Sequence, residues 1–260
     1  MFPLKDDIPT RRFPILTLLL IVANVLMFFV FQGAYFNDAD FDEKVVEYGA
    51  IPYEITHPGD KCDVSADGTR LLCEGQPEVT GEAPDQPPTW LTILTSMFMH
   101  GGLLHLGGNM LFLWIFGNNI EDSMGRPRFI LFYLLGGLVA VFAQTVIEPN
   151  AAVPTIGASG AVAAVLGGYA LLYPRARVVT LLFIIIFFTI VELPALLVLG
   201  GWFALQALYG ASEVATPAGG GGGVAYFAHI GGFLFGLATI RLFANRVHED
   251  YERAHRTPVY

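Results

Sequence analysis

A serine at the start of an apolar stretch is the first residue whose surroundings suit chemistry. Ser159 lies in the sequence Gly157-Ala158-Ser159-Gly160, which opens the apolar stretch 161–173. Small neighbours leave its hydroxyl unhindered, and glycines let backbone N–H groups approach a developing oxyanion. Ser159 is therefore a candidate nucleophile, with close helix packing as the alternative role of these small residues.

Two polar residues share one face of an earlier apolar stretch. His105 and Asn109 are four residues apart within 103–120, so an α-helix places them on the same face. Histidine and asparagine side chains are costly at membrane depth and need partners there. The pair therefore serves either a polar contact between helices or a functional site.

A second histidine of interest lies beside a stripe of small residues. Gly232 and Gly236 follow His229 at helical spacing, and a small residue recurs at every fourth position across 160–168. Stripes of small residues let two helix backbones approach closely. We therefore expect these two helices to pack together, which would set His229 beside Ser159.

These residues belong to a chain that is too apolar for a soluble domain of its length. Of the 260 residues, 54% are hydrophobic and 14% are charged, and the mean hydropathy is +0.55. Runs of about 20 apolar residues, at about 1.5 Å per residue, cross roughly 30 Å of hydrocarbon. The sequence predicts an all-α polytopic membrane protein, a six-helix bundle with a short central helix that carries the serine. The expected spans are residues 14–33, 103–120, 129–147, 161–173, 194–209 and 224–243.

The distribution of charge predicts the orientation of these spans. The net charge is −9, and most acidic residues fall in the loop 34–90. Most basic residues cluster before the first span, after the second, fourth and sixth spans, and near the C-terminus. The positive-inside rule makes those clusters cytoplasmic. We therefore divide the chain into a cytoplasmic tail 1–13, a membrane domain 14–244 with the external loop 34–90, and a cytoplasmic tail 245–260.

The loop 34–90 is expected to lack a packed core, and the loop 210–223 is expected to be mobile. The loop 34–90 is rich in proline, glycine and acids, and the loop 210–223 ends in five glycines, which predicts mobility. The apolar run 178–209 is too long for one span, and Pro194 divides it. Residues 178–191 are expected at the cytoplasmic interface together with Glu192, although their path and the role of Glu192 stay open.

The chain offers one possible disulfide and weak prospects for metal binding. Cys62 and Cys73 are the only cysteines, and in an oxidising exterior they could form a disulfide, with free thiols as the alternative. His100 and His105 are five residues apart, which puts them on different helical faces. We therefore expect no metal and no cofactor, and the arrangement of basic residues suggests no nucleic-acid partner.

The predicted topology brings four polar residues to one level of the bilayer. One span separates the helices of Ser159 and His229, so both lie near the outer surface, as do His105 and Asn109. A neutral histidine can take the proton of a serine and later protonate a leaving amine. Asn109, His105 and the Ser159 N–H would hold the oxyanion. Because no Asp or Glu is placed to orient His229, the sequence predicts a Ser-His dyad.

Taken together, these motifs resemble those of the rhomboid family of intramembrane serine proteases. The resemblance covers His105-x-x-x-Asn109, Gly157-x-Ser159-Gly160 and Ala228-His229-Ile230-Gly231-Gly232, in that order along the chain. It implies a six-helix fold with a water-filled cavity open to the outside. It also implies that Ser159 attacks, that His229 is the base, and that His105 and Asn109 serve the oxyanion.

The resemblance extends to a substrate gate but is incomplete before the second span. Gly201-Trp202-Phe203 resembles the lateral gate of the family, so Trp202 is a candidate gate residue, with core packing as the alternative. His100 matches a histidine near the cavity that is usually structural. The Trp-Arg pair common in the family is Trp90-Leu91 here, and the outer loop is enlarged and acidic.

The sequence therefore predicts an intramembrane serine endopeptidase of a bacterial plasma membrane, with both termini cytoplasmic. The resemblance implies that it cleaves single-span membrane proteins at small residues near helix-breaking sequence. The alternative is a proteolytically silent relative that binds or escorts membrane clients, which the intact Ser159 and His229 disfavour. A transporter is disfavoured because the polar residues lie at one end of the spans rather than at the midplane.

Overall fold

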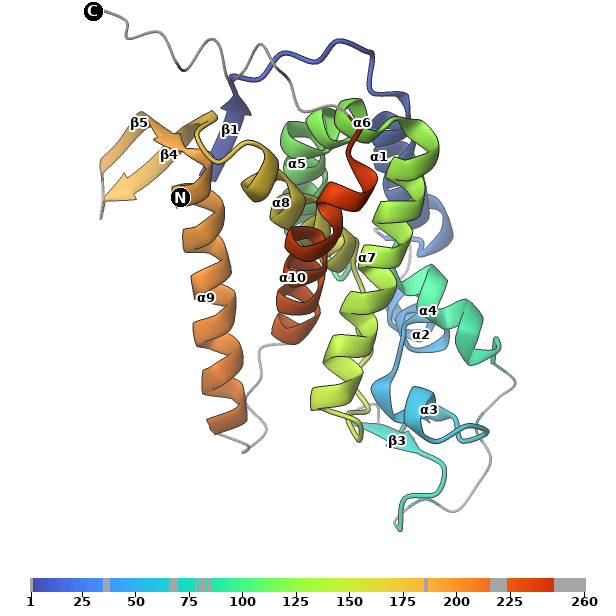
Figure 1. The fold of residues 1–260 in the computed structure, drawn as a ribbon. Coiled ribbons are helices and arrows are strands. Elements are labelled where there is room, and N and C mark those ends of the chain that lie inside the picture. Colours follow the sequence, from blue (N-terminus) through green and yellow to red (C-terminus); the bar gives the residue numbers. More distant parts are fainter. Residues whose placement is uncertain are drawn as a thin grey trace, which may run out of the picture.

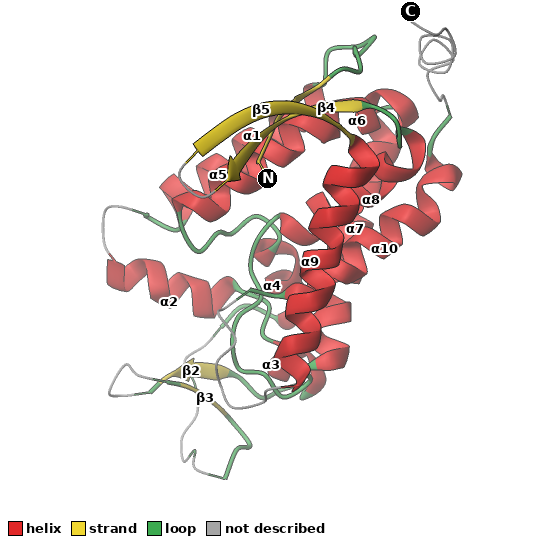
Figure 2. Cartoon of the chain, turned by 90° about the vertical axis from the view of Figure 1, so that its left-hand side faces the viewer, coloured by secondary structure: helices red, strands yellow, loops and turns green. Residues whose placement is uncertain are grey.

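The computed structural model is a bundle of apolar helices with a small sheet at one end and a folded loop region at the other (Figures 1 and 2). It describes residues 2–34, 38–65, 70–77, 79, 83, 86–184, 187–215 and 224–245. We call the end that carries β1, β4 and β5 the sheet side, and the end that carries α2, α3, β2 and β3 the loop side. The predicted tail 245–260 lies outside the described residues, except for Asn245.

Helical segments of the described chain overlap the ranges that were expected to span the membrane. Three of them, α7, α9 and α10, are each long and apolar enough to cross a bilayer. Two of the others are continued by π-helical turns without a break in the chain. This supports the predicted helical membrane fold. The segments are α1 (Ile15–Leu26) with η1 (Met27–Phe31), α5 (Leu103–Phe112) with η2 (Leu113–Gly117) and α6 (Asn118–Met124), α7 (Arg126–Ile147), α8 (Ser159–Leu172), α9 (Ala195–Ala215) and α10 (Tyr226–Phe243).

Helix α8 is the buried centre of the bundle, and α10 lies directly against it. Twelve of the 14 residues of α8 are buried. A Cβ atom on Gly232 would lie 2.1 Å from the carbonyl oxygen of Gly160, and one on Gly236 would lie 1.9 Å from that of Ala164. Only glycine permits backbones this close, so the predicted packing of the two small-residue stripes is confirmed.

The sheet side holds a three-stranded antiparallel sheet that the all-α prediction omitted. β4 (Arg177–Ile184) and β5 (Phe187–Pro194) form a hairpin, and β1 (Phe2–Asp6) pairs with β4 from Phe2↔Leu181 to Asp6↔Val178. The β-branched and aromatic residues of this apolar run favour strands. Residues 2–6 are thus a strand rather than part of a free tail, and the open path of 178–193 is a hairpin.

A buried carboxylate attaches β1 to the bundle. Asp6 Oδ2 accepts hydrogen bonds from Tyr169 Oη at 2.6 Å and from Asn119 Nδ2 at 2.7 Å. Tyr169 belongs to α8 and Asn119 to α6. The first strand therefore contacts the same helix that begins with Ser159.

The loop region has a small core of its own, contrary to the prediction. It contains α2 (Asp38–Tyr48), α3 (Pro52–Thr56), β2 (Cys62–Val64) and β3 (Leu71–Cys73), and it leads into α4 (Thr89–Ser96). A disulfide joins Cys62 to Cys73 across the β2–β3 pair. The sequence did not predict this core because its few apolar residues are dispersed among prolines, glycines and acids. They pack together around the disulfide. The buried cluster comprises Val46, Ile51, Tyr53, Cys62 and Cys73.

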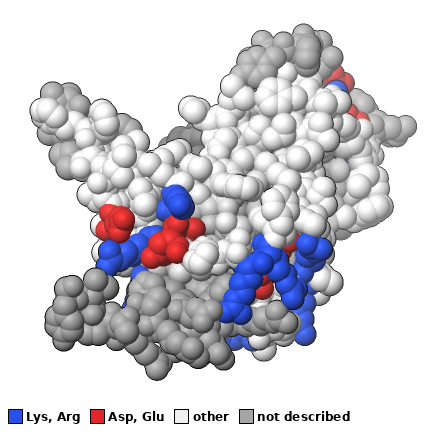
Figure 3. All heavy atoms as spheres, turned by 90° about the horizontal axis from the view of Figure 1, so that it is seen from above, with Lys and Arg blue, Asp and Glu red and all other residues white. Residues whose placement is uncertain are grey.

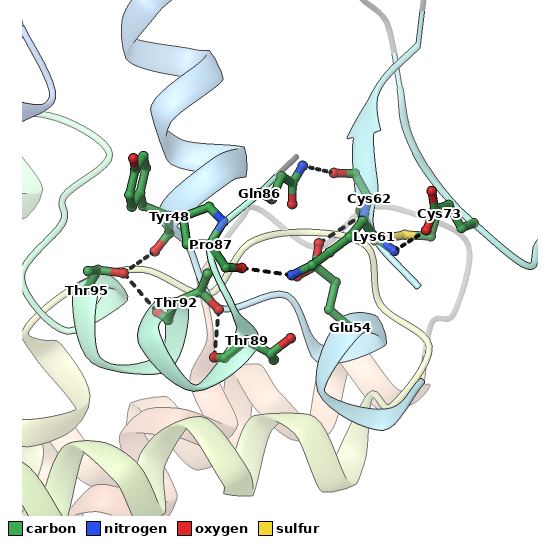
Figure 4. Close-up of polar contacts among 11 residues, drawn as sticks. Tyr48, Glu54, Lys61, Cys62, Cys73, Gln86, Pro87, Thr89, Thr92 and Thr95 are labelled. Carbon is green, nitrogen blue, oxygen red and sulfur yellow. Dashed lines mark hydrogen bonds and ion pairs between the residues drawn. A yellow bond between two sulfur atoms is a disulfide. The ribbon is translucent and has the colours of Figure 1, made fainter. Parts of the chain in front are cut away.

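Polar contacts fasten this region together and to α4 (Figure 4). Glu54 accepts the Cys62 N–H at 2.9 Å and forms an ion pair with Lys61 at 3.2 Å. Lys61 also donates to the Pro87 carbonyl at 3.0 Å, just before α4. Thr95 of α4 donates to the Tyr48 carbonyl at 2.7 Å. The chain that follows α4 is thus fixed to the loop region before it enters the bundle.

Helix α9 is longer than predicted at its loop-side end. Residues 210–215, expected in a loop, continue the helix, and Gly210 is buried within it. Gly210 lies against Tyr226, whose Cβ would be 3.3 Å from an added Cβ, so the small residue here serves packing rather than a turn. The glycine run 219–223 lies outside the described residues.

Basic side chains gather on the sheet side of the molecule (Figure 3). Arg126 and Arg128 lie at the start of α7, and Arg241 lies near the end of α10. Glu192 pairs with Arg177 at 3.2 Å at the base of the hairpin, where both side chains are exposed. This surface therefore carries the cation clusters that the sequence placed between the spans.

Candidate active site

Ser159 begins α8 two residues after a glycine in a left-handed conformation. Gly157 has φ = 126°, which L-residues rarely adopt, and its N–H donates to the Ser96 carbonyl at 2.9 Å. That bond ties the turn before α8 to the end of α4. The serine hydroxyl is thereby held at the loop-side end of the buried helix.

The Ser159 hydroxyl lies within hydrogen-bond distance of His229. The distance from Ser159 Oγ to His229 Nε2 is 2.7 Å, across 70 residues of sequence. His229 lies in the first turn of α10 and is only 9% exposed. The close backbone contact of α8 and α10 at Gly160 and Gly232 brings the two residues together.

Helix α10 is also held at its N-terminus by α7. Gln144 Oε1 accepts the N–H groups of Phe227 and Ala228 at 3.1 and 3.2 Å. These are N–H groups of the first turn, which have no partner within the helix. Gln144 therefore fixes the turn that carries His229, a role the sequence analysis did not anticipate.

The second ring nitrogen of His229 meets a residue that the sequence analysis missed. His229 Nδ1 lies 2.9 Å from Gln206 Oε1 on α9. Trp202, one turn earlier on α9, has its ring centroid 5.7 Å from that of His229. A lone glutamine four residues after Trp202 in an apolar span is the sequence signal that would have found it.

The side chain of Asn109, on α5, carries an amide donor without a partner among the described residues. Its side chain is buried at 7% exposure, and Nδ2 has no hydrogen-bond partner among the described residues. A buried amide without a partner is costly, and such groups are uncommon in folded proteins. The arrangement suits an amide that donates to a bound oxygen atom.

His105 lies next to the turn that precedes the serine. Its Nδ1 accepts the Gly101 N–H at 3.4 Å, which leaves the hydrogen on Nε2. A Cβ atom on Gly157 would lie 2.8 Å from His105 Nε2 and 3.4 Å from Ser159 Oγ. The missing side chain of Gly157 thus leaves His105 and Ser159 facing the same small volume.

One cavity of about 510 Å³ contains all five of the sequence-predicted site residues. Its lining comes from α4, α5, α7, α8, α9 and α10 together with the segments just before α5, α8 and α10. The volume is within the range of small-ligand sites. The residues in question are His105, Asn109, Ser159, Trp202 and His229.

His100 is buried beside this site without lining the cavity. Gln32 accepts its N–H at 2.9 Å and donates to its carbonyl at 3.0 Å. Its ring packs edge-on against His105 with centroids 5.1 Å apart. Within the described part of the chain, no group of three or more His, Cys, Asp or Glu side chains is arranged to hold a metal ion.

Comparison with known proteins identifies relatives of this chain. Its residues 87–246 match the family model described as the Rhomboid domain. The chain is 31% identical over 155 residues to "Rhomboid protein 1, mitochondrial" of Saccharomyces cerevisiae, a match covering 56% of the chain and 40% of that protein. It is 32% identical over 149 residues to "Presenilin-associated rhomboid-like protein A, mitochondrial" of Danio rerio, covering 56% and 36%.

A bacterial relative is more similar over a shorter segment. The chain is 42% identical over 84 residues to "Rhomboid protease GluP" of Bacillus subtilis, a match covering 32% of the chain and 16% of that protein. The chain thus matches less than half the length of each of these three relatives. Because the family model matches more than half of the chain, this integral membrane protein belongs to the rhomboid family.

Proposed function

We propose that this rhomboid protein is an intramembrane serine endopeptidase that acts through a Ser159–His229 dyad. The observation that carries the proposal is the 2.7 Å distance from Ser159 Oγ to His229 Nε2 at the wall of the cavity. A serine becomes a nucleophile when a base within hydrogen-bond reach accepts its proton. The similarity to a protein named as a rhomboid protease supports the same reaction.

The reaction proceeds through an acyl-enzyme. Ser159 Oγ bonds to the carbonyl carbon of the substrate while its proton passes to His229 Nε2. The C–N bond then breaks, and His229 returns the proton to the leaving amine. Water attacks the acyl-enzyme, His229 takes a proton from that water, and the proton returns to Ser159 as the acid product leaves.

The oxyanion of each tetrahedral intermediate accepts hydrogen bonds from groups already in place. Asn109 Nδ2 is the unpaired donor, and His105 Nε2–H is the second. The backbone N–H of Ser159, in the first turn of α8, is the third. Donors that are fixed before the reaction stabilise developing charge without reorganisation.

Single-span membrane proteins are the proposed substrates, with cleavage at small residues near helix-breaking sequence. This class follows from the family resemblance. Trp202 lines the cavity from α9, a helix with few buried residues, which supports a role at the lateral entrance. No cofactor enters this mechanism.

We further propose that the sheet side faces the cytoplasm and that the cavity is reached from the opposite side. The basic clusters of the sheet side support this orientation by the positive-inside rule. The Cys62–Cys73 disulfide on the loop side fits an oxidising exterior. In a bacterial plasma membrane, both termini would then be cytoplasmic.

Labelling with a fluorophosphonate serine probe tests the proposed function. Purified protein in detergent should label, whereas Ser159→Ala and His229→Ala should not, with Ser123→Ala as the control for a serine outside the cavity. Folding of each variant is checked by thermal unfolding. Absence of labelling in folded wild-type protein would instead support a silent relative that binds membrane clients.

A further inference from the structure

The catalytic histidine has two ring nitrogens, and the proposed reaction uses only one of them. For Nε2 to accept the proton of Ser159, the hydrogen of the neutral ring must be on Nδ1. A buried ring can exchange tautomers, and the tautomer with hydrogen on Nε2 cannot act as the base. The group that contacts Nδ1 therefore determines the fraction of molecules in which His229 has the reactive tautomer.

Gln206 lies at this nitrogen. Its Oε1 is 2.9 Å from His229 Nδ1, and an amide oxygen can only accept a hydrogen bond. The contact therefore favours hydrogen on Nδ1 and leaves the lone pair of Nε2 directed at Ser159 Oγ, 2.7 Å away. The three residues form a chain of two hydrogen bonds across α8, α10 and α9.

The face of α9 that carries Gln206 is set by its neighbours. Trp202 and Gln206 are one turn apart, and Phe203 stacks on Phe233 of α10 with ring centroids 4.6 Å apart. Leu208, on the exposed face of the same helix, is 63% exposed. Gln206 is thus held towards α10 by aromatic packing on its own face.

We propose that Gln206 is a positioning residue that selects the reactive tautomer and orientation of His229. This inference rests on the proposed function. It adds a neutral third member to the predicted dyad, in the position where soluble serine proteases place a carboxylate. The amide holds the ring without adding a charge to the membrane interior, where a carboxylate would be costly.

Gln206 and the candidate gate residue Trp202 both lie on α9, so a movement of this helix would also change the orientation of His229. Any displacement of α9 that moves Gln206 by more than a hydrogen-bond length releases Nδ1. The base is then competent only when α9 lies against α10. A movement of α9 away from α10 would therefore displace Trp202 and Gln206 together.

The test measures the inactivation rate constant and the dissociation constant of the fluorophosphonate probe as functions of pH. Gln206→Leu should lower the rate constant about 10-fold to 100-fold, the worth of a lost buried hydrogen bond, and leave probe binding unchanged. Gln206→Glu should retain labelling and move the acid limb of the pH profile up by about one pH unit, because its carboxylate favours the charged ring. Leu208→Ala is the matched control.

His105 of α5 is an ionisable side chain that lines the same cavity as His229. It is unchanged in every variant, so its contribution cancels in the comparison. Thermal unfolding of each variant separates positioning from stability: a merely structural role would lower the unfolding temperature in Gln206→Leu and leave the acid limb of Gln206→Glu unmoved.

Proton-detected NMR of protein labelled with ¹⁵N-histidine provides a readout that does not require activity. The signal assigned to His229 by its loss in His229→Ala should report hydrogen on Nδ1 in wild type and a mixture of tautomers in Gln206→Leu. Wild-type labelling with an unchanged rate constant and spectrum in Gln206→Leu overturns the inference alone. No labelling of folded wild type overturns the proposed function and the inference with it.

Discussion

The side-chain amide of Asn109 is unusual because it is buried and has no hydrogen-bond acceptor among the described residues. Nδ2 is buried and unpaired among the described residues, on the wall of the cavity that holds Ser159. An unpaired buried amide costs about 1–3 kcal/mol. An intermediate that accepts its hydrogen bond would recover this free energy at the moment of reaction.

Asn109→Ala should therefore lower kcat by about 100-fold to 1,000-fold, the usual effect of removing one oxyanion donor. KM should change little, because the donor acts on charge that develops only during the reaction. Steady-state cleavage of a single-span substrate in detergent measures both constants. Asn118→Ala, which removes an amide outside the cavity, is the control; equal losses in the two variants would refute the oxyanion role.

At the level of single residues, the sequence was informative where a residue type was out of place. Ser159, His229, His105 and Asn109 are polar groups in apolar runs, and the structure brings all four to one cavity. Gln206 fits the same description but was overlooked, because only the position of α9 against α10 shows what it contacts. The spacing of residues within one helix does not reveal which residues of another helix they contact.

The packing of α8 against α10 is the contact between elements that the candidate site depends on most. Their backbones approach so closely that a Cβ atom on Gly232 would overlap the Gly160 carbonyl oxygen. Backbone atoms cannot move aside as a flexible side chain can. A single methyl group at this crossing must separate the helices and, with them, Ser159 from His229.

Gly232→Ala should accordingly lower the free energy of unfolding by roughly 1–3 kcal/mol, as overpacking does, and reduce probe labelling at least 10-fold. Gly200→Ala is the matched control, since an added Cβ at this helical glycine meets nothing within 4 Å. Thermal unfolding and labelling rates in detergent provide the measurement. A Gly232→Ala protein with wild-type values of both would contradict the packing.

At the level of elements, periodicity predicted the helices but not the strands. The stripes of small residues identified the α8–α10 contact because helix packing follows a short repeat. The sequence does not predict the β4–β5 hairpin, because an apolar run of this kind fits either a membrane span or a strand. The strand that completes the sheet, β1, lies far from β4 and β5 in the sequence, so no local pattern indicates the pairing.

Considered as a whole molecule, the protein holds its first strand to the bundle through a buried carboxylate, that of Asp6. Burial raises the pKa of Asp6 to about 6 from its ordinary value of 3.8, and the hydrogen bond from Tyr169 opposes that rise. The group favours the folded state when protonated. Its contribution is therefore complete below about pH 4 and is lost as the pH rises through about 6.

Asp6→Asn should remove this loss. The rise in pKa corresponds to about 3 kcal/mol, so at pH 8 the variant should be more stable than wild type by up to that amount. Unfolding temperatures in detergent between pH 4 and pH 8 measure the effect. Asp42→Asn, which changes an exposed carboxylate of α2 on the loop side, should leave the pH dependence unchanged. The same slope in wild type and Asp6→Asn would rule out the role of Asp6.

The bond between Asp6 and Tyr169 also imposes an order on biogenesis. The two residues are 163 positions apart, so at 5–20 residues per second the ribosome adds Tyr169 roughly 8–33 s after Asp6. Throughout that interval the first strand has neither its helix nor its sheet partner. A strand that is synthesised well before its partners thus docks late, and the sheet side is complete only after the serine helix has been synthesised.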